Sequence, residues 1–323
     1  MIINFNKRRD DYQQNRLFSY LQSQLPFKIL KTEFIRNQVI KITTKDAITI
    51  LKGFPSLEHI KIQADLTSAL KTEGFSQVPE FLSMNKPIFL DNEYYSFQEY
   101  IQPGLPVFNY KRKKDRQDGL HLLSKFHAAS KPIVQEFSKK LPHTSLYRKW
   151  KERLIQFNHN LSIISGFIDQ KFLIEICCWA EQALKGMERD QPIAEEQVIL
   201  HGDVAHHNFI RHVSGGLYII DFDLTAIGPE RYDLLQYSNR ILPFLGWSLK
   251  ELSKLNTINS YTKDKEFLYA LAYPADILRE WNRLIRNGQQ NNPQRVLYVT
   301  GLTMNQLNLR RSFVKTIFEK TET

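Results

Sequence analysis

Three oxygen-bearing side chains stand out by their spacing in the second half of the chain. Asp203 follows a short apolar run, Asn208 comes five residues later, and Asp221 ends another apolar run. Carboxylate and carboxamide oxygens of this kind suit Mg²⁺, which binds through one or two carboxylates together with substrate phosphates. A remaining carboxylate can accept the proton of an attacking hydroxyl. The pattern therefore indicates phosphoryl transfer.

Short strands are expected to position these three side chains. An apolar strand at residues 198–200 precedes the loop with Asp203, and Asn208 begins the next strand. The turn Ser214-Gly215-Gly216 reverses the chain, and a third strand leads to Asp221. A carboxylate, a carboxamide and a second carboxylate are thus expected to converge at strand ends.

The first hundred residues favour a β-rich module. A helix is expected at residues 11–25. Another is expected from the cap Ser56 to about Lys71, and Glu73-Gly74 terminates it. Alternating or β-branched runs predict strands at residues 27–34, 38–43, 47–51, 88–90 and 94–100. The polar residues 44–46 predict a hairpin turn.

A Pro- and Gly-rich break at residues 102–106 is expected to separate two lobes, residues 1–102 and 103–323. Most of the second lobe has helical patterning. Helices are predicted at residues 115–130, 145–164, 171–189, 231–242, 248–256, 267–287 and 293–319, the last with a break at Gly301.

The motif His201-Gly202-Asp203, with Asn208 five residues on and Ile220-Asp221 beyond it, resembles the aminoglycoside phosphotransferase/choline kinase group of protein-kinase-like folds. The resemblance implies an α+β, two-lobed fold, with a small antiparallel β-sheet lobe containing one helix and a large, mainly helical C-terminal lobe. It implies that Asp203 is the catalytic base, that Asn208 and Asp221 bind Mg²⁺, and that ATP is the phosphate donor. Asp223 stands in place of the glycine of the kinase Asp-Phe-Gly element, as is common in this group.

Several phrases are most similar to the kinase-like spore coat proteins of the CotS type. They are residues 50–52, 71–79, 201–208 and 269–274. This resemblance implies a role in sporulation, spore coat proteins as partners, and a location in the cytoplasm or the spore coat. It also leaves open a structural coat protein of this fold with weak or lost catalysis.

The resemblance assigns nucleotide contacts to the first lobe. Lys52 corresponds to the lysine over the α- and β-phosphates, and the carbonyl of Glu99 and the N–H of Ile101 correspond to the adenine contacts. The acid partner of Lys52 stays open between Asp65 and Glu58. The phosphate-covering loop, expected at residues 33–38, contains no glycine, so Arg36 is a candidate to supply charge.

Histidines near Asp203 raise one rival, a zinc hydrolase that uses His201, Asp203, His206 and His207. That assignment leaves Asn208 and Asp221 without a role. His201 is instead expected to brace the loop through hydrogen bonds. The resemblance gives Asp233 the task of holding the loop in shape, and His127 is expected to be a structural core histidine.

Composition sets the remaining limits. The 323 residues are 42% hydrophobic and 24% charged, which excludes a disordered or collagen-like chain. The net charge of +10 favours anionic partners, but the basic run at residues 111–114 lacks the aromatic residues of a nucleic-acid platform, so no nucleic acid is expected. No segment has the ~18–20 apolar residues of a membrane span. Adjacent Cys177 and Cys178 fit a reducing compartment. No motif identifies the phosphate acceptor.

Overall fold

The computed structural model describes residues 18–23, 28–36, 38–82, 88–90, 92–189 and 196–322. Its internal contacts group the chain into two units. Unit 1 comprises residues 1–107 and 209–223, and unit 2 comprises residues 108–208 and 224–323. Unit 1 therefore takes a hairpin from the middle of the chain. The boundary expected after residue 102 stays a prediction, because contact grouping alone does not define a folding domain.

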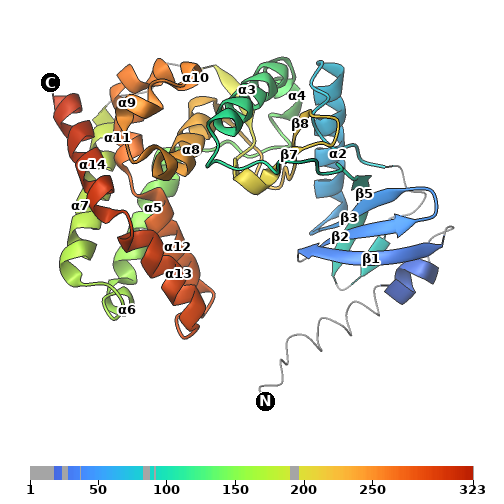
Figure 1. The fold of residues 1–323 in the computed structure, drawn as a ribbon, viewed down its shortest axis with the longest axis horizontal. Coiled ribbons are helices and arrows are strands. Elements are labelled where there is room, and N and C mark those ends of the chain that lie inside the picture. The colour runs from blue at the N-terminus through green and yellow to red at the C-terminus, as the bar shows by residue number, and fades with distance from the viewer. Residues whose placement is uncertain are drawn as a thin grey trace. The chain divides into compact units, whose positions relative to one another are not determined.

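Unit 1 is built on a five-stranded antiparallel sheet (Figure 1). The order across the sheet is β1 (Ile29–Arg36), β2 (Val39–Thr44), β3 (Ile48–Phe54), β5 (Glu93–Glu99) and β4 (Ile88–Leu90). The five strands confirm the strand predictions for this region. Strand β1 continues to Arg36, however, so residues 33–36 of the expected loop belong to a strand.

Alternation along the strands divides the sheet into two faces. One face buries Ile40, Ile42, Leu51 and Phe97 in a core that also receives Leu21. Because successive side chains of a strand point to opposite faces, Lys52 lies on the other face from Leu51. Lys52 is expected to end its strand, but β3 continues to Phe54, so the lysine has strand residues before and after it.

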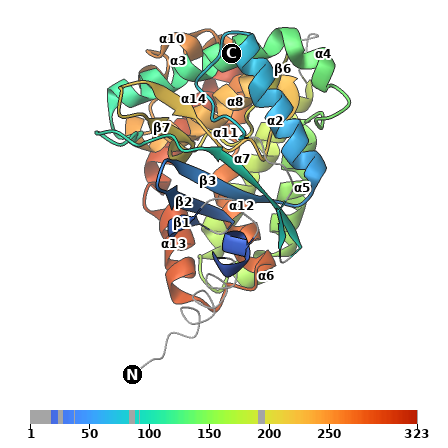
Figure 2. The same ribbon diagram turned by 90° about the vertical axis from the view of Figure 1, so that its right-hand side faces the viewer.

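One helix, α2 (Leu57–Thr72), packs against β3 (Figure 2). Its cap is the predicted one, since the hydroxyl of Ser56 accepts a hydrogen bond from the N–H of His59 at 3.2 Å. The chain leaves the helix at Gly74, which has a φ of +84°. Of the helix expected at residues 11–25, residues 18–23 are helical, and the rest lies outside the described residues.

The hairpin of β7 (Phe209–Arg211) and β8 (Leu217–Ile219) is attached to unit 1 by backbone hydrogen bonds. The N–H of Gly104 donates to Arg211 at 2.7 Å, and the N–H of Ile219 donates to Gln77 at 3.0 Å. The hairpin turn contains Gly215 at a φ of +96°. These bonds place the end of β8, with Asp221, in the same unit as Lys52.

Unit 2 is mainly helical (Figure 1). Its longer helices are α3 (Lys113–Ser130), α5 (Leu146–His159), α7 (Gln170–Arg189), α8 (Arg231–Ile241), α11 (Lys265–Ala272), α12 (Ala275–Arg286), α13 (Pro293–Met304) and α14 (Leu307–Glu322). Helix α11 packs against α7, α8 and α14.

Several predicted helices are interrupted in the structure. The one expected at residues 267–287 is divided at Tyr273-Pro274, because proline cannot continue the hydrogen bonding of the preceding helix. The one at 145–164 is divided at Asn160 into α5 and α6 (Leu161–Ile164). The last break falls after Met304 rather than at Gly301. Residues 248–256 give only α9 (Leu249–Leu252) and the start of α10 (Asn256–Asn259).

A two-stranded antiparallel sheet carries the loop with Asp203. Strand β6 (Gln197–Leu200) was predicted, and its partner β9 (Ala226–Pro229) was not. Strand β9 cannot be predicted from sequence because it contains a Gly-Pro pair, and both residues are rare in strands. The protein thus has the expected α+β composition, with an N-terminal antiparallel sheet and a larger helical part. None of the helices in the described ranges combines the length and apolar character that a membrane crossing requires.

Candidate active site

Lys52 is a buried cation in unit 1. Its side chain is 7% exposed, and its Nζ lies 2.7 Å from Oδ1 of Asp221 and 2.6 Å from Oδ1 of Asp223. Neither Asp65 nor Glu58, the two candidates from helix α2, forms an ion pair with it among the described residues. The partners of the lysine therefore come from the segment that follows β8.

Asp221 lies between two cations. Its second oxygen, Oδ2, accepts a hydrogen bond from Nη2 of Arg36 at 2.7 Å. Burial alone would raise the pKa of Asp221, but the charge and hydrogen bond of Lys52, and then those of Arg36, hold this pKa well below the usual carboxyl range. Asp221 has a φ of +73°, a left-handed conformation that Asp tolerates better than most residues. The carboxylate is thus held ionised at a sharp bend of the chain.

Asp223 and Gln63 were not predicted as site residues. Asp223 Oδ1 receives a hydrogen bond from Nε2 of Gln63 at 2.8 Å, in addition to the bond from Lys52. Gln63 is buried on α2, where kinases carry the acid that pairs with the lysine. The one sequence signal for Asp223 was its position in place of the motif glycine.

Glu99 and Ile101 lie where β5 leaves the sheet. Glu99 ends the strand opposite Thr49, and Ile101 is 4% exposed. Within the described part of the chain, the N–H of Ile101 donates no hydrogen bond. A backbone donor left in this condition is suited to a ligand with an acceptor atom, such as a purine ring.

In unit 2, Asp233 of α8 holds the loop that carries Asp203 through hydrogen bonds. The carboxylate of Asp233 accepts hydrogen bonds from the N–H of His201 at 2.7 Å, the N–H of Gly202 at 3.0 Å and Nε2 of His127 at 3.0 Å. Burial acts to raise the pKa of Asp233, but the bond from His127, with His201 and the Gly202 amide, lowers it overall. The expected loop-holding task of Asp233 agrees with this geometry.

The loop also requires glycine at position 202. Gly202 has a φ of +77°, and a Cβ there would meet the carbonyl oxygen of Leu224 at 2.1 Å. Gln236 of α8 bonds the chain on either side of Asp203. Its Oε1 accepts from the N–H of Val204 at 2.7 Å, and its Nε2 donates to the carbonyl of Gly202 at 2.8 Å. The backbone around Asp203 is therefore preorganised.

Asn208 closes the same loop. It is fully buried, and its Nδ2 donates to the carbonyl of Asp203 at 2.8 Å. Its Oδ1 is buried without a hydrogen-bond partner among the described residues. An unsatisfied buried oxygen costs about 1–3 kcal/mol, so this atom is suited to a ligand with positive charge.

Asp203 itself is half-buried and bonded by one cation. Nη2 of Arg240, from α8, lies 2.5 Å from Oδ1 of Asp203. Its other oxygen, Oδ2, accepts no hydrogen bond from the described residues. That oxygen remains available to a substrate hydroxyl.

The histidines of the loop do not form a zinc site. His201 is fully buried and its Nδ1 accepts from the N–H of Asp203 at 3.3 Å, which matches its expected bracing task. His206 and His207 are exposed. Across the described ranges, no three His, Cys, Asp or Glu side chains are placed to share a metal ion. The rival zinc-hydrolase interpretation therefore has no supporting geometry here.

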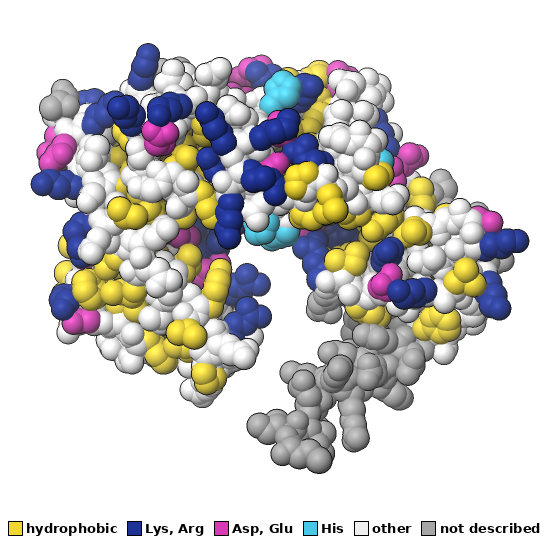
Figure 3. Space-filling view, viewed as in Figure 1, with side chains coloured by type: hydrophobic (Ala, Val, Ile, Leu, Met, Phe, Trp, Pro, Cys, Tyr) yellow, Lys and Arg dark blue, Asp and Glu magenta, His cyan; other side chains and the backbone are white. Residues whose placement is uncertain are grey.

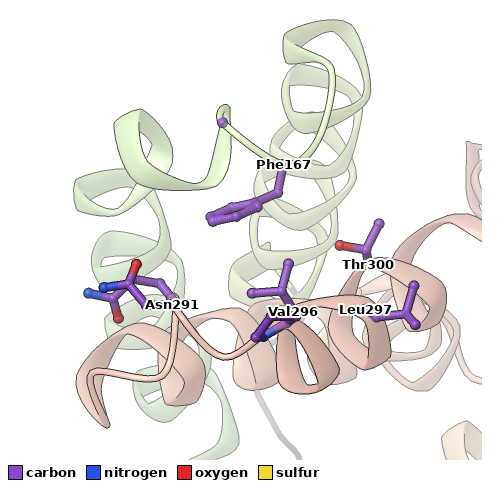
Figure 4. Close-up of a pocket in the computed structure, with 8 residues that line it drawn as sticks. Phe167, Asn291, Val296, Leu297 and Thr300 are labelled. Atoms are coloured by element: carbon purple, nitrogen blue, oxygen red, sulfur yellow. The ribbon is translucent and has the colours of Figure 1, made fainter.

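A pocket elsewhere in unit 2 lacks catalytic groups. It lies between the turn after α6 and the start of α13, and Phe167, Asn291, Val296, Leu297 and Thr300 line it together with Gly166, Gln290 and Pro293 (Figure 4). No charged side chain is among these lining residues. Among the residues predicted from sequence, Lys52 pairs with Asp221 in unit 1, and the Asn208 side chain bonds the backbone of Asp203 in unit 2.

Comparison with known proteins identifies the family. Residues 35–247 match the model of the phosphotransferase enzyme family, and the chain belongs to that family. A search of curated proteins gave no match.

Solved structures share the fold at low sequence identity. An aminoglycoside phosphotransferase from Alicyclobacillus acidocaldarius is 15% identical with a TM-score of 0.71, and the match covers 93% of this chain and 95% of that one. A spectinomycin phosphotransferase, solved with ADP and spectinomycin, is 17% identical with a TM-score of 0.57 and coverages of 96% and 98%. A macrolide 2′-phosphotransferase from Brachybacterium faecium is 13% identical with a TM-score of 0.56 and coverages of 90% and 98%. The expected kinase-like fold class is confirmed.

Proposed function

We propose that the protein is an ATP- and Mg²⁺-dependent phosphotransferase that acts on a hydroxyl group. The observation that carries the proposal is Oδ1 of Asn208, which is buried and accepts no hydrogen bond from any described residue, on a loop whose backbone is otherwise tightly bonded. The carboxylate of Asp221, kept ionised by Lys52 and Arg36, provides oxygen ligands of the same hard type. An amide oxygen and a carboxylate oxygen fit Mg²⁺ in preference to softer metals.

Each residue then has a defined task. Asn208 and Asp221 would hold Mg²⁺, which when bound neutralises the phosphate charge. Lys52 contacts the phosphates, and the Glu99 carbonyl and Ile101 N–H orient the adenine. Oδ2 of Asp203 takes the proton of the acceptor hydroxyl while the acceptor oxygen forms its bond to the γ-phosphorus. The bond from that phosphorus to the bridging oxygen breaks, and ADP leaves with both electrons of that bond.

Nucleotide complexes of neighbours support part of this proposal. The spectinomycin phosphotransferase was solved with ADP, and a related phosphotransferase with GDP and kanamycin. These nucleotides belong to those proteins. For this chain we propose ATP as the phosphate donor. We also propose that the protein acts in the spore coat, because residues 71–79 and 201–208 resemble those of coat proteins.

The test is nucleotide-dependent stabilisation. With ATP and Mg²⁺ together, the melting temperature of the wild-type protein should rise, whereas ATP without Mg²⁺ should give a smaller rise. Asp221→Ala should abolish the Mg²⁺-dependent part, and Asp46→Ala, an exposed carboxylate in the β2–β3 turn, should leave it intact. Transfer of labelled γ-phosphate to a panel of metabolites and spore proteins then seeks the acceptor.

A second candidate is a catalytically weak coat protein of the same fold. The short β1–β2 connection favours it, because residues 33–38 contain no glycine and cannot approach phosphates as closely as a glycine-rich loop does. Absence of any shift at millimolar ATP with Mg²⁺, from a protein that melts cooperatively, would favour this candidate over the enzyme.

A further inference from the structure

Arg36, the last residue of β1, lies on the same face of the sheet as Lys52. Arg36 is paired opposite Val39 of β2, and Val39 is paired opposite Lys52 of β3. Residues directly opposite one another in an antiparallel sheet point to the same face, and neighbouring strands are about 4.8 Å apart. Arg36 and Lys52 therefore stand in one row across the sheet, with backbones roughly 10 Å apart.

A β-bulge in β1 produces this orientation of Arg36. Phe34 is paired with Ile40 of β2. The next pair is Arg36 with Val39, so Ile35 is an extra residue in β1. In a regular strand Arg36 would share a face with Phe34 and lie on the side of the sheet that buries Ile40. The extra residue turns Arg36 to the opposite face, and bulges that re-aim a side chain in this way are over-represented beside active sites.

The carboxylate of Asp221 is bonded by both cations of this row. Nη2 of Arg36 lies 2.7 Å from Oδ2 of Asp221, and Nζ of Lys52 lies 2.7 Å from Oδ1. Both oxygens of the carboxylate proposed to hold Mg²⁺ are thus occupied by positive side chains. A divalent cation added to Asp221 alone would be repelled by both side chains, because like charges at close range are unfavourable.

The two cations differ in how firmly they are held. The side chain of Lys52 is 7% exposed and also bonds Asp223. The side chain of Arg36 is 42% exposed, and within the described ranges Asp221 is its one ion-pair partner. An ion pair with one exposed partner contributes little to stability, so Arg36 can leave Asp221 at low cost.

Positive charge alone does not distinguish Arg36. Lys and Arg side chains are spread widely over the face of the molecule shown in Figure 3, in keeping with the net charge of +10. Arg36 is distinguished by its contact with Asp221 and by its place at the end of β1, where kinases have a glycine-rich loop over the phosphates. Residues 33–38 contain no glycine. A guanidinium group compensates, because its planar fork of donors fits phosphate oxygens.

We propose that Arg36 is a phosphate-binding residue that exchanges partners when the nucleotide binds. Without nucleotide, Arg36 and Lys52 hold the two oxygens of Asp221. With nucleotide, Arg36 leaves Asp221 for the phosphate oxygens, and Oδ2 of Asp221 becomes available to Mg²⁺. Metal and nucleotide therefore bind cooperatively. This inference rests on the proposed function, because it takes Lys52 and Asp221 as the site of ATP and Mg²⁺.

The first arm of the test measures metal binding without nucleotide, with Mn²⁺ as a paramagnetic substitute for Mg²⁺. Arg36→Gln removes one cation from Asp221, so Mn²⁺ alone should bind about fivefold more tightly than to the wild type, as measured by EPR. Arg36→Lys keeps the charge and should bind Mn²⁺ as weakly as the wild type. The matched control is Lys31→Gln on the same strand, which removes a lysine that pairs with Glu33 at 2.9 Å and should also behave as the wild type.

The second arm measures ATP affinity at saturating Mg²⁺ by isothermal titration calorimetry. Arg36→Gln should bind ATP about tenfold more weakly, because the phosphates lose a charged, forked donor. Arg36→Lys should show an intermediate loss, and Lys31→Gln should show none. Tighter metal binding combined with weaker nucleotide binding in one folded variant is specific to an exchange of partners. A merely structural ion pair would leave both affinities unchanged or weaken both, and either result would overturn the proposal.

The outcomes separate this inference from the proposed function. Neither binding measurement needs an acceptor. If the wild type binds ATP but transfers phosphate to nothing, the proposed activity fails, while opposite shifts in Arg36→Gln still support the exchange. If the wild type and Arg36→Gln bind ATP equally well, only the role of Arg36 is refuted. A wild type that binds no ATP refutes both.

Discussion

The ammonium group of Lys52 lies 2.6 Å from Oδ1 of Asp223, two residues beyond Asp221. In kinases an acid on the helix of the small lobe pairs with this lysine. Here α2 presents Gln63 instead, and its amide donates to the same oxygen of Asp223 at 2.8 Å. The counter-ion of the lysine thus comes from the segment after β8 and not from the helix. The helix contributes Gln63, a polar side chain that orients the carboxylate of Asp223.

Removal of Asp223 should weaken use of ATP. In Asp223→Ala, Lys52 keeps Asp221 as its remaining acid, so we expect kcat/KM for ATP to fall by about tenfold, as for loss of one partly buried ion pair. The double variant Asp223→Ala/Gln63→Glu returns an acid to α2 and should recover part of the loss. Asp46→Ala serves as the control. Full activity in Asp223→Ala would show that Asp221 alone positions the lysine.

Asp203→Asn tests the proposed base while preserving side-chain shape. We expect turnover to fall by at least about 100-fold, because an amide cannot take the hydroxyl proton. The free energy of unfolding should change by less than about 1 kcal/mol, since Asp203 is only half-buried. Labelled phosphate transfer and denaturant titration measure the two quantities. Retained turnover would refute Asp203 as the base.

Asp233 should make stability depend on acid pH. Its pKa is lower in the folded protein than the ordinary value of about 3.9 in the unfolded chain, so the folded state binds fewer protons in that range. Its contribution is present in full above pH ~4 and is lost as the pH falls through the folded-state pKa. Stability of the wild type should therefore decrease below pH ~4.

The variant Asp233→Asn provides the comparison. It should be about 3 kcal/mol less stable at neutral pH, because the buried loop amides and His127 lose a charged acceptor. Its stability should decline less steeply in acid, as measured by urea unfolding across the pH range. Parallel pH profiles for the two proteins would exclude Asp233 as the source of the acid dependence.

The adjacent cysteines should differ in reactivity. Burial, followed by the charge of Glu181, raises the pKa of Cys177 to about 11, and its Sγ lies 3.4 Å from Oδ1 of Asn158. Cys178 is exposed. Since the thiolate is the reactive form, iodoacetamide near pH 8 should modify Cys178 first, and Cys177 should respond only as the pH approaches 11. Peptide mass spectrometry decides this, and equal rates would contradict it.

The amino-acid sequence by itself determined the strands and the helix of the first unit. Alternation at Ile40, Ile42 and Leu51, the cap Ser56 and the terminator Gly74 are local signals, and each appears in the structure as predicted. Such signals act over a few residues, so they can be read without knowledge of the fold. The loop around Asp203 differs in one point, because Asn208 was expected to begin a strand and instead ends a 3₁₀-helical turn, His206–Asn208, before β7 begins at Phe209.

Long-range partners were decided only by the tertiary structure. Nothing near Lys52 in sequence indicates Asp223, 171 residues away, and nothing near Asp203 indicates Arg240, 37 residues away. Strand β9 also depends on its distant partner, because it forms only by pairing with β6. The strength of the electrostatic interaction between two side chains depends on their distance and their burial. Both are set by packing between distant segments rather than by local propensity.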